Sequence, residues 1–229
     1  ISLWPTGGAI LGLPMLGRLA TSLVPAYGVA LRPDTITLAA WHEALFRQPA
    51  TTRAFVNSFS LSIGAALVLL VICLPLAWLM ERSPTRLGRL FDSLIDLPYA
   101  LPGVVLAIAM ILLLINLPFT EATPYGTIWI IFLAYLARFM TIMFRPIQAS
   151  IRQLDPAMNE AAQSVGASFF QRLRTIILPL TAPAAAAGAI LVFLTAFNEL
   201  TVSALLWSSG TETLGVMIFN LDDSGETVM

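Results

Sequence analysis

The chain has 229 residues, of which 58% are hydrophobic and only 11% are charged, and its formal net charge is −1. Soluble domains carry about 25% charged residues, so this composition excludes an ordinary water-soluble globular protein and indicates a protein that is solvated by lipid. The near-neutral charge also gives no reason to expect nucleic acid as a partner.

Long runs with few or no charged residues mark the segments that could cross a bilayer, which takes about 20 residues of helix. A weak run covers residues 9–31, and stronger runs cover residues 55–80, 97–120, 122–144 and 175–198. Apolar runs of this length favour helices, because a helix satisfies its own backbone hydrogen bonds in lipid. The sequence therefore predicts an all-α fold, a polytopic bundle of about five transmembrane helices that forms a single domain over residues 1–229.

Charged residues between the spans predict their orientation. The stretches 81–92 and 145–174 carry several arginines each, and the positive-inside rule therefore places both on the cytoplasmic side. The loop around Glu121 and the stretch after the last span, which carries acids but no arginine, are expected outside. The stretch 32–53 holds three arginines, although the alternation of the spans places it outside.

The longest of the cytoplasmic stretches predicts a helix, a turn and a second helix. Asp155 is suited to cap a helix start and Pro156 to occupy its first position. The helix is expected to run to about Val165, where Gly166 can adopt the left-handed conformation that ends helices. A second, short amphipathic helix is expected over residues 168–174. This element offers a surface on the cytoplasmic face that another protein can bind.

The same stretch carries a spaced pattern: EAA, three residues, G, nine residues, I, one residue, LP. Its members are Glu160, Ala161, Ala162, Gly166, Ile176, Leu178 and Pro179. On these residues the chain resembles the membrane permease subunits of binding-protein-dependent (type I) ABC importers, from about Arg53 onward. In that family this loop docks into a groove on the ATPase subunit. The resemblance therefore implies the type I importer transmembrane fold, with residues 150–179 as the ATPase-coupling loop.

The resemblance also implies a location and a set of partners. The expected location is the bacterial cytoplasmic (inner) membrane, in a multi-pass arrangement surrounded by lipid. The expected partners are an ABC ATPase subunit, an external substrate-binding protein and a second permease unit, in a homodimer, a heterodimer or a fused repeat. The expected function is to pass substrate from the binding protein to the cytoplasm.

Two further stretches resemble the ferric-iron uptake permeases of this superfamily. They read DSLIDLPYALPGVVLAIA and FNELTVSALLWSSGTETLGVMIFNL. Those permeases often contain two fused repeats, and this chain is similar to the C-terminal one. The start at Ile1 fits such a fragment, and because the last predicted span leads outward, a further C-terminal helix is expected to be missing. Polyamine, thiamine, phosphonate and sulfate importers are close relatives of that group, so the substrate stays open beside ferric iron.

Catalytic chemistry has little support in this sequence. All twelve basic residues are arginine, whereas a P-loop requires a lysine on the phosphates. ATP is therefore expected to be used by a partner chain, with no cofactor in this one, and the chain is not expected to be an enzyme. One histidine, His42, and one cysteine, Cys73, also disfavour a metal site or an intramembrane hydrolase.

Polar and proline residues in the spans are the remaining candidates. Pro98 and Pro102 are expected to kink or break a helix, which can line a transport pathway. Glu199 is either a pathway residue or an acid at the outer interface, and Arg138 is expected to extend its side chain to the inner interface. An ion-coupled secondary transporter that uses Glu199 and Arg138 is the alternative function. Trp78 is expected to anchor the chain at the inner interface.

Overall fold

The computed structural model describes residues 3–25, 29–43, 47–82, 86–115 and 123–223. Within these ranges the regular elements are helices and no strand occurs, which confirms the predicted all-α fold. The chain forms two compact units, residues 1–54 with 217–229 and residues 55–216.

The first unit contains α1 (Leu3–Thr21) and α2 (Ala39–His42). The α1 helix ends where the hydroxyls of Thr21 and Ser22 bond to the carbonyls of Arg18 and Leu19, at 2.9 and 2.8 Å. Side-chain bonds of this kind compete with helix continuation. The helix therefore stops well short of the end of the weak run 9–31, and it is not one of the helices that qualify as spans.

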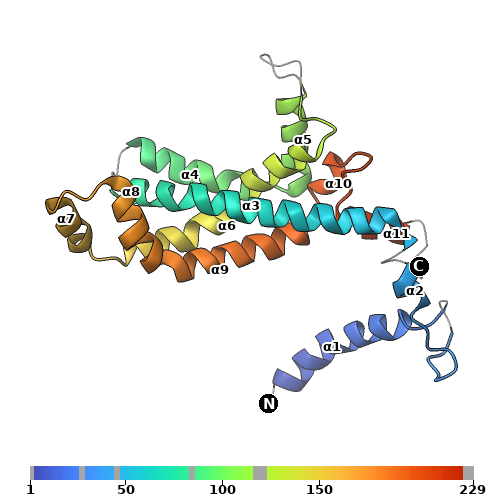
Figure 1. Ribbon diagram of the computed structural model, residues 1–229. Coiled ribbons are helices and arrows are strands. Elements are labelled where there is room, and N and C mark those ends of the chain that lie inside the picture. Colours follow the sequence, from blue (N-terminus) through green and yellow to red (C-terminus); the bar gives the residue numbers. More distant parts are fainter. Residues whose placement is uncertain (1–2, 26–28, 44–46, 83–85, 116–122, 224–229) are drawn as a thin grey trace. The chain divides into compact units, whose positions relative to one another are not determined.

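The second unit is a bundle of long helices with short helices at its ends (Figure 1). In chain order the helices that contribute to it are α3 (Pro49–Arg82), α4 (Arg86–Ala100), α5 (Gly103–Leu114), α6 (Ile128–Arg152), α7 (Pro156–Ser164), α8 (Phe169–Arg172), the π-helical segment η2 (Leu173–Ile177), α9 (Leu178–Phe197), α10 (Ser203–Leu206) and α11 (Leu214–Asp223). The first residues of α3 and the last residues of α11 belong to the first unit.

Fewer helices are straight spans than the sequence predicts. In the described ranges three helices are long and apolar enough to cross a membrane: Pro49–Arg82, Ile128–Arg152 and Phe169–Phe197. The predicted span 97–120 is instead divided between α4 and α5, which are bent by 112° at the break, and its residues 116–120 lie outside the described ranges. The count is thus three, or four if the bent pair is one span, rather than about five.

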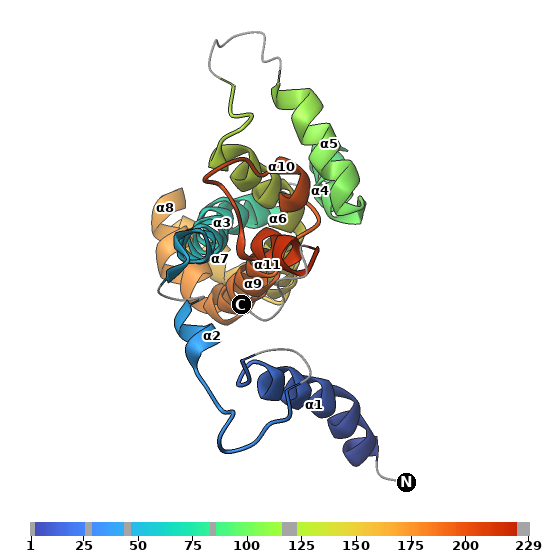
Figure 2. The ribbon, with the colours of Figure 1, turned by 90° about the vertical axis from the view of Figure 1, so that its right-hand side faces the viewer.

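The break between α4 and α5 has a covalent cause. Pro98 lies inside α4, and Pro102 is the N-cap of α5 with an extended ψ of 138°. A proline has no N–H to donate and excludes helical geometry from the residue before it, so the helix cannot continue through Leu101. The α5 helix consequently turns away from the direction of α3 and α9 (Figures 1 and 2), as the two prolines predict.

The α6 helix is the centre of the second unit. The Cys73 thiol of α3 lies 3.9 Å from the Met140 carbonyl, the Thr141 hydroxyl donates to the Ile95 carbonyl of α4, and Gly188 of α9 lies against Met143. At Gly188 of α9 an added Cβ would lie only 3.2 Å from the sulfur of Met143, so α9 approaches α6 through a glycine. Such small residues permit the close packing that holds helices together in lipid.

Most of the apolar surface of the spans faces away from the chain. In the apolar windows of the three spans only 39%, 39% and 28% of residues are buried within the chain. Large side chains such as Val71, Leu112 and Ile190 are 72%, 72% and 59% exposed. Apolar surface of this extent cannot face water, so it must contact lipid or another membrane protein. The chain is therefore embedded in a membrane, as its composition predicts.

The two arginine-rich stretches lie at the same end of the second unit. Arg152, at the end of α6, pairs with Glu81, at the end of α3, across 2.9 Å. At the opposite end Ser208 donates to the Gly126 carbonyl at 2.6 Å, which joins the segment before α6 to the one after α9. The loops that the sequence places on the cytoplasmic side thus share one end of the unit, and those that it places outside share the other. Glu121 and Glu226 lie outside the described residues.

Candidate functional site

The α7 helix begins as its sequence predicts. The Asp155 carboxylate accepts a hydrogen bond from the Ala157 N–H at 2.9 Å, and Pro156 occupies the first helical position. The carboxylate satisfies an N–H that the helix itself cannot pair, and proline has no N–H to leave unpaired. The loop therefore starts α7 at a fixed residue.

The end of α7 is equally well defined. Gly166 has a φ of +82°, and its N–H bonds to the Gln163 carbonyl at 2.9 Å. The next N–H, that of Ala167, bonds to the Ala162 carbonyl at 3.0 Å. This pair of bonds is a Schellman motif, which requires a left-handed residue at the position that Gly166 occupies. Since a Cβ added there would meet nothing within 4 Å, the need for glycine comes from the backbone alone.

The segment after Gly166 differs from the prediction of a separate short helix. Ser168 and Gln171 form a capping box at the start of α8, with bonds of 3.3 and 2.7 Å. The chain then continues through η2 into α9 without leaving helical geometry. The Leu178 N–H bonds to the Leu173 carbonyl, five residues back, and Pro179 has no N–H to offer. The helix accommodates that missing donor by widening into a π turn.

The outer face of the loop carries apolar side chains. None of the residues of α7 is buried. Val165 is 82% exposed and Phe170 is 77% exposed, on either side of the glycine turn. Apolar side chains on a polar turn that nothing in the chain covers are typical of a protein contact. In the sequence, Val165 and Phe170 could have been recognised as contact residues because they are apolar residues close to Gly166 in a stretch rich in polar residues.

A cavity of about 400 Å³ lies between α7 and the ends of the long helices. Glu160 and Asn159 of α7 line it from one side, and Trp78, Glu81 and Arg82 of α3 line it from another. Further lining residues are Ile151, Arg152, Leu154, Asp155, Pro156, Met158, Ile176 and Ile177. The α7 helix is thus set off from the bundle instead of packing closely against it.

One cluster connects α7 and α8 to α3. The Trp78 ring stacks on Phe169 of α8, with ring centroids 4.7 Å apart. The guanidinium carbons of Arg82 and Arg172 lie 5.3 and 5.4 Å from the centre of the Trp78 ring, within the range of cation–π attraction. Trp78 is only 2% exposed. It is therefore buried against these groups and does not anchor the chain at the interface as predicted.

The same cluster reaches α7 through hydrogen bonds. Arg172 donates to the Asn159 amide oxygen at 3.0 Å. With its amide oxygen turned toward the donors, Gln163 accepts from Arg172 at 2.9 Å, from Asn159 at 3.3 Å and also from Arg82. The negative charge of Glu160 also attracts the Arg82 guanidinium and favours its charged form. We name Trp78, Arg82, Asn159, Gln163, Phe169 and Arg172 the Trp78 cluster.

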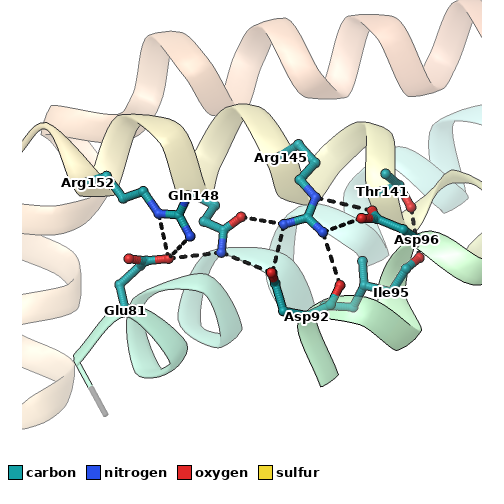
Figure 3. A network of polar contacts seen from close by, with 8 residues as sticks. All are labelled: Glu81, Asp92, Ile95, Asp96, Thr141, Arg145, Gln148 and Arg152. Carbon is teal, nitrogen blue, oxygen red and sulfur yellow. Dashed lines mark hydrogen bonds and ion pairs between the residues drawn. The ribbon is translucent and has the colours of Figure 1, made fainter. Parts of the chain in front are cut away.

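An ion-pair network ties α4 to α6 just inside the same end of the bundle (Figure 3). Arg145 of α6 donates to Asp92 at 2.7 Å and to Asp96 through both of its remaining nitrogens, one of them at 3.1 Å. It also donates to the Gln148 amide oxygen at 2.7 Å. Asp96 is thus held by the same arginine as Asp92. The planar guanidinium allows all these bonds at once.

Gln148 extends the network to α3. Its amide nitrogen donates to Glu81 at 2.9 Å and to Asp92 at 3.1 Å, and Glu81 also accepts from Arg152 at 2.9 Å (Figure 3). Nearby, the Thr141 hydroxyl donates to the Ile95 carbonyl at 2.8 Å. The ends of α3, α4 and α6 are thus joined by one set of polar contacts.

A second ionic site lies at the helix break. Arg138 lies 3.4 Å from the Glu199 carboxylate and donates to the Leu101 carbonyl at 3.2 Å, and the two side chains are only 17% and 10% exposed. The Arg138 side chain is therefore held by Glu199 and Leu101 instead of extending toward the inner interface, and both readings of Glu199, pathway residue or outer-interface acid, stay predictions. The end of α9 lies against the first half of α6, where the Tyr135 hydroxyl donates to the Glu199 carbonyl at 3.4 Å.

Glu199 also begins the next short segment. Its carboxylate accepts from the Val202 N–H at 2.9 Å and from the Thr201 hydroxyl at 2.5 Å. Thr201 in turn packs so closely on Gly103 that a Cβ there would overlap its side chain. Two helix breaks, one after α4 and one after α9, therefore meet at Arg138.

The predicted site residues fall into two groups. Glu160 and Ala161 are exposed on α7, Ala162 is half-buried, and Gly166 ends that helix. Ile176 is half-buried in η2, and Leu178 and Pro179 are exposed at the start of α9. Pro98, Pro102 and Glu199 lie at the helix breaks, away from the loop, and a pathway role for them stays a prediction. Within the described residues no group of three or more His, Cys, Asp and Glu could hold a metal ion.

Comparison with known proteins gives a consistent result. Residues 73–226 match the family described as "Binding-protein-dependent transport system inner membrane component". The chain is 33% identical over 166 residues to the Fe(3+)-transport system permease protein FbpB 2 of Haemophilus influenzae, covering 72% of this chain and 32% of that protein. It is 30% identical over 219 residues to the probable ABC transporter permease protein y4fN of Sinorhizobium fredii, covering 92% of this chain and 37% of that protein.

The chain thus spans about a third of the length of these two relatives. A solved structure shares the fold: a bacterial ABC transporter involved in the import of the acidic polysaccharide alginate. Its matching chain superposes with a TM-score of 0.72 at 20% identity, covering 99% of this chain and 84% of that one.

Proposed function

The chain belongs to the family of inner membrane components of binding-protein-dependent transport systems, and from that premise we propose how it works: it is the permease subunit that a separate ATPase drives through α7. The observation that carries this proposal is the geometry of the loop. A helix with defined ends lies beyond the bundle, buries none of its residues, and is flanked by the exposed side chains of Val165 and Phe170.

The physical argument concerns where energy enters. No lysine is available to build a P-loop in this sequence, so ATP hydrolysis is assigned to a partner chain. The partner would bind α7, with Val165 and Phe170 in an apolar groove and Glu160 at its rim. Movement of α7 would then change the packing of the spans and alternate the access of the pathway between the two faces of the membrane. We place the chain in the bacterial inner membrane, with α7 on the cytoplasmic side.

The remaining partners follow from the same proposal. An external binding protein would deliver substrate at the opposite end, and a second permease unit would complete the pathway. The uncovered apolar faces of α5 and α9 are available for that second unit and for lipid. Ferric iron is the substrate to test first, because the relative from Haemophilus influenzae is an Fe(3+)-transport permease. The alginate importer with the same fold shows how little the fold restricts the substrate.

The test is co-purification of this chain with a candidate ATPase subunit, followed by transport in reconstituted vesicles. The native chain is expected to retain the ATPase, and Glu160→Lys and Gly166→Phe are expected to release it or to lose substrate-stimulated ATP hydrolysis. Asp34→Lys, an equal charge reversal on an exposed residue of the first unit, is the matched control and should leave both unchanged.

Normal binding and coupling by both loop variants would contradict the proposal. Uptake that continues without the ATPase and collapses with the ion gradient would favour the alternative, an ion-coupled transporter. The structure gives that alternative little support, because Glu199 is already engaged by Arg138 and by the Val202 N–H.

A further inference from the structure

The α3 helix is not directly connected along the chain to the loop that would receive the ATPase, because α4, α5 and α6 lie between them. The α6 helix leads directly into α7, and α8 leads through η2 into α9, so movement of the loop reaches both through the backbone. The last turn of α3 lies more than seventy residues earlier in the sequence than α7. A displacement of α7 therefore reaches α3 through non-covalent contacts, either indirectly by way of α6 and α9 or directly through side chains.

Apolar packing does not supply those contacts. The α7 helix has no buried residue, and a cavity of about 400 Å³ separates it from the ends of the long helices. Interiors transmit displacement because they are close-packed, and a cavity interrupts that transmission. The polar contacts around the cavity are what remain.

The Trp78 cluster joins α7 to α3 through side chains of α7 itself, whereas the Glu81–Arg152 pair joins α3 only to the end of α6. Asn159 and Gln163 of α7 bond to Arg172, and Arg172 lies 5.4 Å from the centre of the Trp78 ring. Arg82 lies 5.3 Å from the same ring and also bonds to Gln163. Each contact in this cluster is either a directional hydrogen bond or a guanidinium group held over a flat ring. Such contacts resist sliding and rotation of α7 relative to α3.

Trp78 is in turn fixed to the bundle. It is 2% exposed, and its neighbours on the inner face of α3, Leu74 and Ala77, are 6% and 0% exposed. A force on the Trp78 ring therefore acts on α3 as a whole rather than on a mobile side chain.

We propose that Trp78, together with Arg82 and Arg172, is the joint through which movement of α7 is transmitted to α3. These are positioning residues: they act on the pathway through α3 and need not contact the ATPase or the substrate. The inference rests on the proposed function, since it requires that α7 receives the ATPase.

The test uses the complex of the full chain with its ATPase and binding protein in vesicles, with three measurements: ATPase retained, ATP hydrolysed and substrate moved. Trp78→Leu removes the ring, and Arg172→Gln removes the charge but keeps a polar side chain. Both are expected to retain the ATPase, and the substrate moved per ATP hydrolysed should fall about two- to fivefold, the factor that losing a partly exposed cation–π contact would produce.

Two further variants separate a joint from a merely structural contact. Trp78→Phe keeps a ring for Phe169 and the guanidinium groups, and it should restore most of the coupling that Trp78→Leu loses. Arg174→Gln removes an exposed arginine two residues beyond Arg172 and should couple as the native chain does.

The outcomes are distinguishable. If the native chain retains no ATPase, the proposed function fails and this inference fails with it. If the native chain couples but Trp78→Leu and Arg172→Gln move substrate at the native ratio, only the inference is overturned. Loss of the ATPase from both variants would also overturn it, because the cluster would then belong to the docking surface.

Discussion

At the scale of single residues, the ion pair at the helix break shows what the sequence could not supply. Charge and hydropathy place Arg138 and Glu199 in two apolar runs, but the distance between them depends on how far α9 extends along α6. That offset is decided by close contacts such as the one between Gly188 and Met143, which leave no periodic signal. The sequence therefore does not show that the two residues are partners.

The first prediction concerns this pair. Arg138→Gln or Glu199→Gln alone should lower the free energy of unfolding by about 3–5 kcal/mol, because each leaves one buried charge without its partner. The double variant should recover most of that loss. The measurement is a double-mutant cycle of unfolding in detergent.

The exposed pair of Arg47 and Glu43, 3.5 Å apart with side chains 68% and 41% exposed, is the matched control. Its coupling energy should stay below about 0.5 kcal/mol. Strictly additive effects at Arg138 and Glu199 would show that the two charges do not depend on each other.

The second prediction concerns Gly103, where a Cβ would overlap the side chain of Thr201. Gly103→Ala should destabilise the chain by about 1–3 kcal/mol, as overpacking does, and Thr201→Gly should partly rescue it. Gly17→Ala is the control, since a Cβ there meets nothing within 4 Å and should leave stability unchanged or slightly higher. Equal thermal midpoints for Gly103→Ala and the native chain would rule out the close contact.

At the scale of helices, capping residues and prolines predicted where helices begin and end, whereas hydropathy did not predict how many straight spans the chain forms. Asp155, Pro156 and Gly166 mark the limits of α7 because caps depend on neighbouring backbone groups only. The prolines at 98 and 102 likewise predicted the break between α4 and α5. The span count failed because hydropathy cannot distinguish a straight helix from a bent pair of the same composition. The continuity of α8, η2 and α9 was missed since a π turn has no sequence period.

The third prediction tests the end of α7. Gly166→Ala should raise the free energy of the local conformation by about 1–2 kcal/mol, because a Cβ is disfavoured at positive φ. Gly166→Asn, which tolerates this conformation better, should have a smaller effect. Amide hydrogen exchange over residues 156–164 is the measurement, with faster exchange expected in the alanine variant. Unchanged exchange would mean that the Schellman motif does not hold α7.

The fourth prediction tests the network between α4 and α6. Arg145→Lys keeps the charge but loses the forked bonds to Asp92 and Asp96, so lysine should not substitute for arginine. Because these groups are a third or more exposed, the loss should be moderate, and the thermal midpoint should fall by about 2–4 °C. Arg86→Lys, at the exposed start of α4, should leave it unchanged. Equal midpoints for all three proteins would show that the forked bonds of Arg145 add no stability.

At the scale of the whole molecule, the sequence predicted the class of fold and the position of the loop, but not how the loop is supported. Composition alone requires lipid around the chain, and the spaced pattern from Glu160 to Pro179 identifies the element that projects from the bundle. The Trp78 cluster lies outside that pattern, because its members come from α3, α7 and α8 and meet only in three dimensions. Contacts between distant segments of this kind are not visible in one sequence.

The central claim is that an ATPase binds this chain at α7, and one crosslinking measurement tests it most directly. Cys73 is the only cysteine and is buried, so Cys73→Ala followed by Val165→Cys gives a single reactive site on the loop. A maleimide photo-crosslinker at that site should join the chain to the ATPase subunit, with a yield that changes when ATP is added. The same label at Tyr125→Cys, an exposed position near Gly126, should give no such product. Crosslinking from Tyr125→Cys but not from Val165→Cys would contradict the account.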